Sequence, residues 1–276
     1  MQAHTLRVAY QGEAGAFSEE TALAAMPGAQ TQGFDTFDAA AQAVACGDAD
    51  AVCLPVENTL FGSIGRAYEL LHHFDLWANH ARIARIRQCL IARSATPVES
   101  ICSVASHPVA LEQCRSLFAA WPRMKPVVVH DTAGAVRSMM DGSLAADACI
   151  ASEFAAKRYA ARVVLHDVHD DPSNYTRFFV AVRRDAAAFP VTARTTDAIV
   201  GAELANRPGA LRDALTRFAD AGVNLTNLVC RPIPSRPWSY RFFFELAAGA
   251  ATAHRIAQSI AALGDARVYG CYETIG

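Results

Sequence analysis

The chain has 276 residues, 52% of them hydrophobic, so it is long and apolar enough for one large domain or two ordinary ones with packed cores. Lysine plus arginine total 25 and aspartate plus glutamate total 27, which gives a net charge of −2 and argues against a nucleic-acid partner. The start of the chain lacks the apolar core of a signal peptide, and no apolar run is long enough to span a membrane. The eight cysteines form no Cys-x-x-Cys pair, and several lie in apolar runs, as is typical of a reducing compartment. We therefore expect a soluble, cytoplasmic protein.

Short apolar runs alternate with helical patterns through the first two thirds of the chain. Strands are expected, in order, at 6–10, 50–54, 83–92, 101–105, 125–130, 147–151, 163–165 and 179–182. Helices are expected between them, with Ser18, Ser106, Asp131 or Thr132, and Ser152 as N-caps; the helix after Ser106 extends through Leu117. This alternation predicts a mostly parallel sheet covered by helices on both faces, with ligands at the carboxyl ends of its strands.

The amount of predicted structure is too large for one short sheet. We expect two lobes, about 1–83 with 170–185 and 84–169, and a ligand in the cleft between them. Residues 186–196 show no clear period and contain a proline, so they are expected to be a linker. Residues 197–276 follow a βαββαβ pattern, which predicts a ferredoxin-like unit.

The run Asn174-Tyr-Thr-Arg-Phe178 stands at an expected loop-to-strand junction, where a rigid scaffold often presents chemistry. Thr176 offers a hydroxyl that can donate a proton, and the always-charged fork of Arg177 fits a carboxylate. This pair suits an acidic substrate that gains or loses a proton-bearing group. The structural alternative is that Thr176 only begins a strand and Arg177 is a solvated charge.

Two other polar loops leave a binding and a structural interpretation open. Glu57 and Asn58 either face a ligand or make ordinary turn hydrogen bonds. His166 and His169, beside two aspartates, have a spacing that can bind zinc, but a solvated charge cluster is the interpretation we favour. We therefore expect no metal.

Six motifs resemble, in the same order, those of the prephenate dehydratase family, which includes the arogenate dehydratases, with a C-terminal ACT domain. They are Tyr10-Gln-Gly-Glu-Ala-Gly-Ala-Phe-Ser-Glu19, Pro55-Val-Glu-Asn-Thr59 with Gly62, Ser106-His-Pro-Val-Ala-Leu-Glu-Gln-Cys114, Asp131-Thr-Ala-Gly134, Ala151-Ser152 and Asn174-Tyr-Thr-Arg-Phe178. The resemblance covers nearly the whole chain. It implies an α/β fold, with a two-lobed, periplasmic-binding-protein-like catalytic domain over 1–185 and a ferredoxin-like ACT regulatory domain over 197–276.

The resemblance implies a carbon–oxygen lyase reaction in phenylalanine biosynthesis. Prephenate would lose carbon dioxide and its ring hydroxyl to give phenylpyruvate, whereas arogenate would give phenylalanine. Aromatisation drives the reaction, so no cofactor or metal is implied. The barrier lies in expelling hydroxide, and a positioned proton donor lowers it.

Several residues acquire roles through this resemblance. Thr176 matches the proton donor, whose hydroxyl would hydrogen-bond the departing oxygen in a dry site or pass on a proton. Arg177 would pair with a substrate carboxylate, and Phe178 would form an apolar wall against water. The positions that would orient the substrate are Asn58, Ser106 and Gln113.

Two departures from the family pattern bear on substrate and regulation. Ala16 stands where many bacterial members have threonine, which leaves prephenate and arogenate both open. Val229-Cys230 replaces a Glu-Ser pair in the C-terminal region, which leaves feedback inhibition by phenylalanine open. The effector site that the resemblance implies comprises Pro208, Gly209, Ala210, Leu211, Asn224 and Leu225.

Two further functions fit the same fold. One is a prephenate decarboxylase-like relative that does not expel hydroxide, against which the intact Thr176-Arg177-Phe178 argues. The other is a non-catalytic sensor that binds a small acid and signals through the ACT domain, which no DNA-binding segment supports. We expect a small-molecule substrate, prephenate or arogenate, with phenylalanine as the candidate effector and no nucleic-acid or membrane partner. Because ACT domains commonly pair edge to edge, we expect a homodimer or homotetramer.

Overall fold

A computed structural model describes residues 5–186, 195–234 and 236–276. The chain forms two compact units, one of Met1–Ala40 with Ala84–Thr176 and the other of Ala41–Ile83 with Arg177–Gly276. Most of the predicted linker lies outside the described residues, and the predicted lobe and domain limits stay a prediction. No helix in the described part of the chain is long and apolar enough to cross a membrane.

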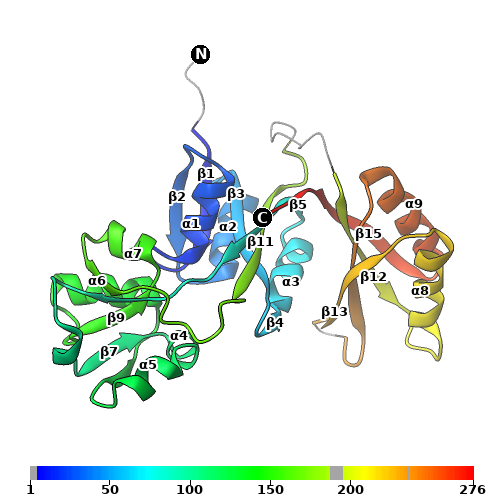
Figure 1. The fold of residues 1–276 in the computed structure, drawn as a ribbon. Helices are drawn as coiled ribbons and strands as arrows, with labels where there is room; N and C mark the ends of the chain where they lie inside the picture. The colour runs from blue at the N-terminus through cyan, green and yellow to red at the C-terminus, as the bar shows by residue number, and fades with distance from the viewer. Residues whose placement is uncertain (1–4, 187–194, 235) are drawn as a thin grey trace. The chain divides into compact units, whose positions relative to one another are not determined.

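The first unit contains a mixed five-stranded sheet in the order β10-β6-β9-β7-β8. Its strands are β6 (Cys89–Ala92), β7 (Ser103–Ser106), β8 (Lys125–Val128), β9 (Ala148–Ala151) and β10 (Arg162–Leu165). β7 runs parallel to β8 and β9, whereas β6 runs antiparallel to β9 and β10. Its helices are η1 (Val98–Ser100), α4 (Pro108–Glu112), α5 (Arg115–Ala120), α6 (Thr132–Asp141) and α7 (Glu153–Arg158) (Figure 1).

Helices cover both faces of this sheet, as predicted, because successive side chains of a strand point to opposite faces. Ile91 and Cys149 pack into a core with α6 and α7. Their chain neighbours Leu90 and Ile150 pack into a second core with α4 and α5. The central strands β6, β7 and β9 are therefore apolar on both sides, which is why they appear in the sequence as short continuous apolar runs.

The first unit also holds a parallel strand pair, β1 (Arg7–Gln11) and β2 (Gln30–Phe34), connected through α1 (Phe17–Ala25). Ala16 is the N-cap of α1, so the predicted cap at Ser18 is wrong; the nearby carboxylate of Glu19 instead accepts a hydrogen bond from the Gly15 amide at 2.5 Å. The sequence did not predict β2, because its residues are largely exposed and show no apolar alternation.

The second unit contains a sheet in the order β13-β14-β12-β15-β5-β11-β3. These strands are β3 (Ala51–Asn58), β5 (Leu76–Arg85), β11 (Tyr175–Arg183), β12 (Asp197–Leu204), β13 (Leu225–Pro232), β14 (Tyr240–Leu246) and β15 (Gly264–Tyr272). Two short strands, β4 (Gly62–Ser63) and β16 (Thr274–Ile275), add to β3 and β5. The helices are α2 (Phe37–Cys46), α3 (Gly65–His73), α8 (Ala210–Asp220) and α9 (Ala250–Ala261), of which α2 begins in the first unit.

The predicted βαββαβ unit is confirmed in β12-α8-β13-β14-α9-β15, where β14 pairs antiparallel with β12 and β13. Helices α8 and α9 cover one face of this sheet, where Phe218, Phe244 and Ile256 share a core. Helix α3 lies against the opposite face (Figure 1). Two residues of α3, Tyr68 and His72, make hydrogen bonds with side chains of that face.

Three predicted elements are wrong in their limits. The strand expected at 83–92 is two strands, since β5 ends at Arg85 and β6 begins at Cys89. The helix expected at 108–117 is divided into α4 and α5, because the carboxylate of Asp170 accepts hydrogen bonds from the amides that begin α5. β3 continues through Pro55 to Asn58, since the fixed φ of proline is compatible with an extended strand.

Candidate functional site

The corner Asn174–Phe178 runs into strand β11, at the loop-to-strand junction predicted from the sequence. Thr176 is 7% exposed and Phe178 is buried, whereas Tyr175 is exposed. The alternation of a strand places Thr176 and Phe178 on one face of β11 and Arg177 on the other. Burial gives the Thr176 hydroxyl the poorly hydrated setting in which a hydrogen bond is strongest.

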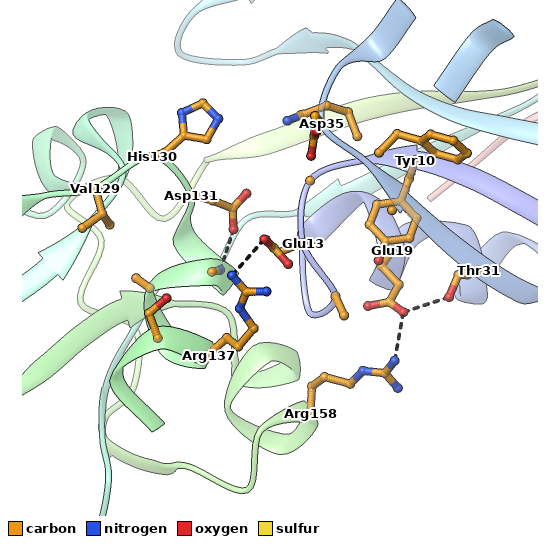
Figure 2. A pocket seen from close by; sticks show the side chains of 18 of the residues that line it. Tyr10, Glu13, Glu19, Thr31, Asp35, Val129, His130, Asp131, Arg137 and Arg158 are labelled. Atoms are coloured by element: carbon orange, nitrogen blue, oxygen red, sulfur yellow. Dashed lines mark hydrogen bonds and ion pairs between the residues drawn. The ribbon is translucent and has the colours of Figure 1, made fainter. Parts of the chain in front are cut away.

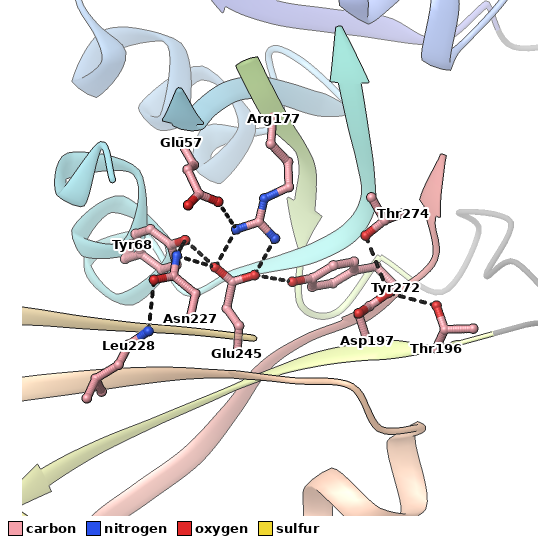
Figure 3. Close-up of polar contacts among 10 residues, drawn as sticks. All are labelled: Glu57, Tyr68, Arg177, Thr196, Asp197, Asn227, Leu228, Glu245, Tyr272 and Thr274. Carbon is pink, nitrogen blue, oxygen red and sulfur yellow. Dashed lines mark hydrogen bonds and ion pairs between the residues drawn. The ribbon is translucent and has the colours of Figure 1, made fainter. Parts of the chain in front are cut away.

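The guanidinium of Arg177 is held by two carboxylates (Figure 3). Its Nη1 donates to Glu245 Oε2 at 2.5 Å, and its Nη2 donates to Glu245 Oε1 at 2.7 Å. Nη2 also donates to Glu57 Oε2 at 2.9 Å. Burial favours a lower pKa for Arg177, but the hydrogen bonds and charge of Glu245 outweigh it, so the pKa is raised and the group stays charged.

These contacts bear on the role expected for Arg177, which stays a prediction. We expected its fork to bind a substrate carboxylate, but in this structure the fork already binds Glu245 on both nitrogen atoms. A substrate would have to displace a buried carboxylate to reach it, which is costly because an unpaired buried charge is left behind. The geometry therefore favours Arg177 as an anchor of the corner over a direct partner of the substrate.

Asn58 ends β3 and makes the turn hydrogen bonds of the structural alternative. Its Oδ1 accepts from the amides of Leu60 at 2.9 Å and Phe61 at 3.1 Å. The preceding residue, Glu57, is the second carboxylate on Arg177, so the structure does bring Arg177 and the Glu57-Asn58 motif together. A role for Asn58 in orienting the substrate stays a prediction.

Ser106 and Gln113 flank helix α4. Ser106 is fully buried, and its hydroxyl donates to the carbonyl of Ile150 at 2.6 Å, which joins β7 to β9. The N-cap of α4 is His107, whose Nδ1 accepts from Val109, so the predicted cap is wrong by one residue. The hydroxyl proton of Ser106 is thus used within the fold, and only its lone pairs are suited to a substrate donor.

The carbonyl of Gln113 accepts a hydrogen bond from the Asp170 amide at 2.7 Å. Asp170 lies four residues before the corner, and its carboxylate accepts from the amides of Arg115 and Ser116, both at 2.9 Å. The motif that contains Gln113 therefore makes hydrogen bonds with the loop that precedes Thr176. Whether the Gln113 side chain orients a substrate stays a prediction.

The histidines of this loop have separate structural contacts. His166 Nδ1 lies 3.9 Å from Glu153, and His169 Nδ1 accepts from the Gln88 amide at 3.4 Å. Among the described residues, no three His, Cys, Asp or Glu side chains are grouped so that they could hold a metal ion. These contacts favour the structural interpretation of the loop.

A pocket of about 610 Å³ lies in the first unit, between the loop after β1 and the start of α6 (Figure 2). Parts of two sequence motifs line it, from Tyr10 to Glu19 and from Asp131 to Gly134. Its volume is within the range of small-molecule sites. Within the described residues, the lining includes none of the corner residues and none of Asn58, Ser106 and Gln113.

Charged groups of both signs line this pocket. Arg137 lies 3.2 Å from Glu13, and Arg158 lies 3.9 Å from the buried carboxylate of Glu19. Glu19 also accepts from the hydroxyl of Thr31 at 2.8 Å. No sequence motif marks these two arginines as pocket residues, because neither belongs to the motifs that line the pocket.

A second, small pocket of about 130 Å³ lies in the βαββαβ unit. Of the six predicted effector residues it is lined by Ala210 and Leu211 only, beside Trp238, Tyr240 and Phe242. Gly209 is the N-cap of α8 with φ 81, a conformation that favours glycine. Asn224 and Leu225 instead border β14 through backbone hydrogen bonds and pairing, so the described chain does not gather all six around this pocket.

Comparisons with known proteins identify both parts of the chain. The family model for prephenate dehydratase matches residues 8–186, and the model for the ACT domain matches residues 198–263. The arogenate dehydratase/prephenate dehydratase 2 of Arabidopsis thaliana is 37% identical over 84% of this chain. This chain spans 60% of the length of that relative.

Two solved structures share the fold over nearly the whole chain. One is described as GqqA, a novel type of quorum quenching acylase; it is 28% identical, covers 97% of both chains and has a TM-score of 0.86. The other is a prephenate dehydratase from Arthrobacter aurescens in complex with L-Phe; it is 25% identical, with a TM-score of 0.86 over 97% of this chain and 90% of that chain. The fold expected from the resemblance, an α/β part of the prephenate dehydratase type followed by an ACT domain, is confirmed. The chain therefore belongs to the prephenate dehydratase family.

Proposed function

We propose that the protein is a lyase that dehydrates and decarboxylates prephenate, with arogenate as the alternative substrate. The observation that carries the proposal is the family match over 8–186, which includes a buried Thr176 next to an anchored Arg177. Both features suit the reaction, since a hydrogen-bond donor is most effective when it is shielded from water and fixed in place.

Thr176 is the proposed proton donor. As the ring carboxylate leaves as carbon dioxide, its bonding electrons move into the ring and the hydroxyl at the opposite carbon departs. A hydrogen bond from Thr176 to that oxygen stabilises the developing hydroxide and lowers the barrier. Phe178 lies on the same face of the strand, and its apolar ring helps to keep water from the corner.

The choice between prephenate and arogenate depends on groups that recognise a keto acid or an amino acid. The relative from Arabidopsis thaliana is named for both activities, and one from Petunia hybrida, 37% identical over 83% of this chain, is named arogenate dehydratase 2. Ala16 is buried at the start of α1, where many bacterial members have threonine. We therefore retain arogenate as a substrate to be tested beside prephenate.

Regulation and assembly belong to the same proposal. The structural relative from Arthrobacter aurescens was solved with L-Phe, which supports phenylalanine as an effector of the ACT domain. Val229 is buried and Cys230 exposed on β13, so neither supplies the acid or hydroxyl of the family pattern. We propose a homodimer or homotetramer, to be checked by light scattering, and retain a cytoplasmic location, since all eight cysteines are free.

One assay tests the activity. The purified protein is incubated with prephenate and with arogenate, and the products are separated. Phenylpyruvate from the first or phenylalanine from the second supports the proposal. A product that keeps its ring hydroxyl would indicate decarboxylation alone, and turnover no faster than without protein would leave the sensor as the better function.

A further inference from the structure

The carboxylate of Glu245 on β14 is almost completely enclosed, being 1% exposed. It accepts two hydrogen bonds from Arg177, one from the Tyr68 hydroxyl at 2.5 Å and one from the Tyr272 hydroxyl at 2.7 Å. A fifth comes from Asn227 Nδ2 at 3.0 Å. A buried charge is tolerated only when it is paired and hydrogen-bonded, and Glu245 meets both conditions (Figure 3).

The donors to Glu245 come from segments far apart in the chain. Tyr68 lies on α3, Arg177 on β11, Asn227 on β13 and Tyr272 on β15. Glu245 itself belongs to the region that matches the ACT domain, whereas Arg177 belongs to the region that matches prephenate dehydratase. One carboxylate of the regulatory region therefore contacts a residue of the catalytic motif.

Arg177 has little freedom to move in this arrangement. Its side chain is 15% exposed, and its guanidinium lies 5.5 Å from the centre of the Phe179 ring. Rotation of the side chain would break three charged hydrogen bonds, two to Glu245 and one to Glu57. The two carboxylates differ, because the side chain of Glu57 is 41% exposed and that of Glu245 only 1%, so the hydrogen bonds to Glu245 are the stronger ones.

Fixing Arg177 also fixes its chain neighbours. Thr176 and Arg177 are consecutive in one strand, so the orientation of the peptide unit that joins them sets the direction of the Thr176 hydroxyl. The same guanidinium also restrains the side chain of Glu57, which precedes Asn58. A proton donor must be held to a fraction of an ångström, and a small displacement can reduce turnover about 100-fold.

We propose that Glu245 is a positioning residue for the Asn174–Phe178 corner. It acts through Arg177, so the ACT domain contributes to turnover in the absence of any effector. This inference rests on the proposed function for its kinetic test. The position of the corner can also be measured without a substrate, so the two proposals can fail separately.

The test compares Glu245→Gln with Glu203→Gln. Glu203 on neighbouring β12 is a matched control, because it is also mostly buried and binds two guanidinium groups, those of Arg236 and Arg241, neither of which belongs to the corner. The folded fraction of each variant at the assay temperature is checked by thermal unfolding. Turnover of the preferred substrate then gives kcat and KM separately.

We expect Glu245→Gln to lower kcat about 10- to 100-fold with KM changed by less than about threefold. Glu203→Gln should leave kcat within about twofold, and Glu245→Asp should recover part of the loss because it retains the charge. Once Arg177→Gln is present, adding Glu245→Gln should cost little more, since both act through one contact. Equal losses in the Glu245 and Glu203 variants, or additive losses with Arg177→Gln, would overturn the proposal.

Hydrogen exchange completes the test. We expect amides in a peptide covering 173–183 to exchange about tenfold faster in Glu245→Gln than in the unmodified protein, with little change in Glu203→Gln. If Glu245→Gln does not fold, Tyr272→Phe removes a single donor and should give a smaller increase in the same peptide. Unchanged exchange in a folded variant would overturn the positioning role, whereas absence of turnover in the unmodified protein would overturn only the proposed function.

Discussion

Arginine–glutamate pairs occur in both units, but they should contribute differently to stability because one is exposed and the other buried. In the pocket of the first unit, Glu13 and Arg137 lie 3.2 Å apart with side chains 40% and 49% exposed. In the second unit, Glu245 and Arg177 lie 2.5 Å apart and are nearly enclosed. Exposed pairs contribute little because water and salt screen them, whereas breaking a buried pair leaves a charge without compensation.

This difference indicates where substitutions should have little effect on the stability of the fold. The exposed pair of Glu13 and Arg137 can be replaced with little effect on folding, which suits a region that meets solutes. The cluster around Glu245 also accepts hydrogen bonds from Tyr68 and Tyr272, so loss of one member disturbs the others. We expect substitutions in the two regions to differ in stability by several kcal/mol.

Truncation of the buried carboxylate should give the largest effect on stability. Glu245→Ala leaves the Arg177 guanidinium without its main partner, and we expect the free energy of unfolding to fall by about 3–5 kcal/mol. Glu13→Ala, the matched change in the pocket, should cost no more than about 1 kcal/mol. Urea unfolding of both variants measures the difference, and equal losses would show that burial does not separate the two regions.

A pH dependence should arise from His72, on the same face of the second unit. Burial, followed by the charges of Arg241 and Arg267, lowers the pKa of His72 to about 4. Between pH 6.5 and pH 4, His72 binds a proton in the unfolded chain but not in the folded chain. The free energy of unfolding should therefore fall as the pH falls through this range. Discounted for the partial exposure of His72, the expected loss is about 1–2 kcal/mol.

Thermal unfolding between pH 7 and pH 4.5 tests this effect. The loss should be smaller in His72→Gln, which can still hydrogen-bond the Tyr269 hydroxyl that lies 2.7 Å from Nδ1. The same slope in the variant and the unmodified protein would assign the effect to other groups.

A helix cap at the pocket should have an intermediate effect. Asp131 is the N-cap of α6, and its Oδ1 accepts from the Gly134 amide at 2.6 Å. We expect Asp131→Ala to lower the free energy of unfolding by about 1 kcal/mol, and Asp131→Asn to recover most of it. A loss as large as that of Glu245→Ala would mean that the pocket is more tightly coupled to folding than its exposure suggests.

The smallest effect is expected for the other member of the exposed pair. Arg137→Gln should change the free energy of unfolding by less than about 0.5 kcal/mol at low salt, and by nothing measurable in 1 M salt, where charges are screened within a few ångströms. Chemical unfolding at the two salt concentrations measures this. A loss of stability that persists at high salt would show that the contacts of Arg137 behave like those of the buried cluster around Glu245.

Much of the architecture was predictable because its signals are local. The βαββαβ pattern, the caps at Asp131 and Ser152, and the junction at β11 follow from apolar periodicity and from short polar side chains at helix starts. Strand β2 escaped prediction because its exposed residues show no such periodicity. The division between α4 and α5 also escaped, because the carboxylate that begins α5 comes from Asp170, more than fifty residues away.

The sequence pointed to candidate site residues but not to their contacts. A charged fork beside Thr176 suggests a substrate carboxylate, and the sequence holds no sign that Glu245, 68 residues later, occupies that fork. Likewise, the serine hydroxyl at 106 is taken by the carbonyl of Ile150, which strand pairing alone brings near. Such pairings depend on tertiary packing, for which a single sequence has no local signal.

The most direct test of the account is the turnover of Thr176→Ala beside Thr176→Ser and the unmodified protein. We expect the alanine variant to lose about 100- to 1,000-fold in kcat with an unchanged unfolding transition, as is typical when a group that stabilises developing negative charge is removed. The serine variant, which retains the hydroxyl, should keep most of the activity. Turnover by the alanine variant within a few-fold of the unmodified protein would contradict the assignment of the chemistry to this corner.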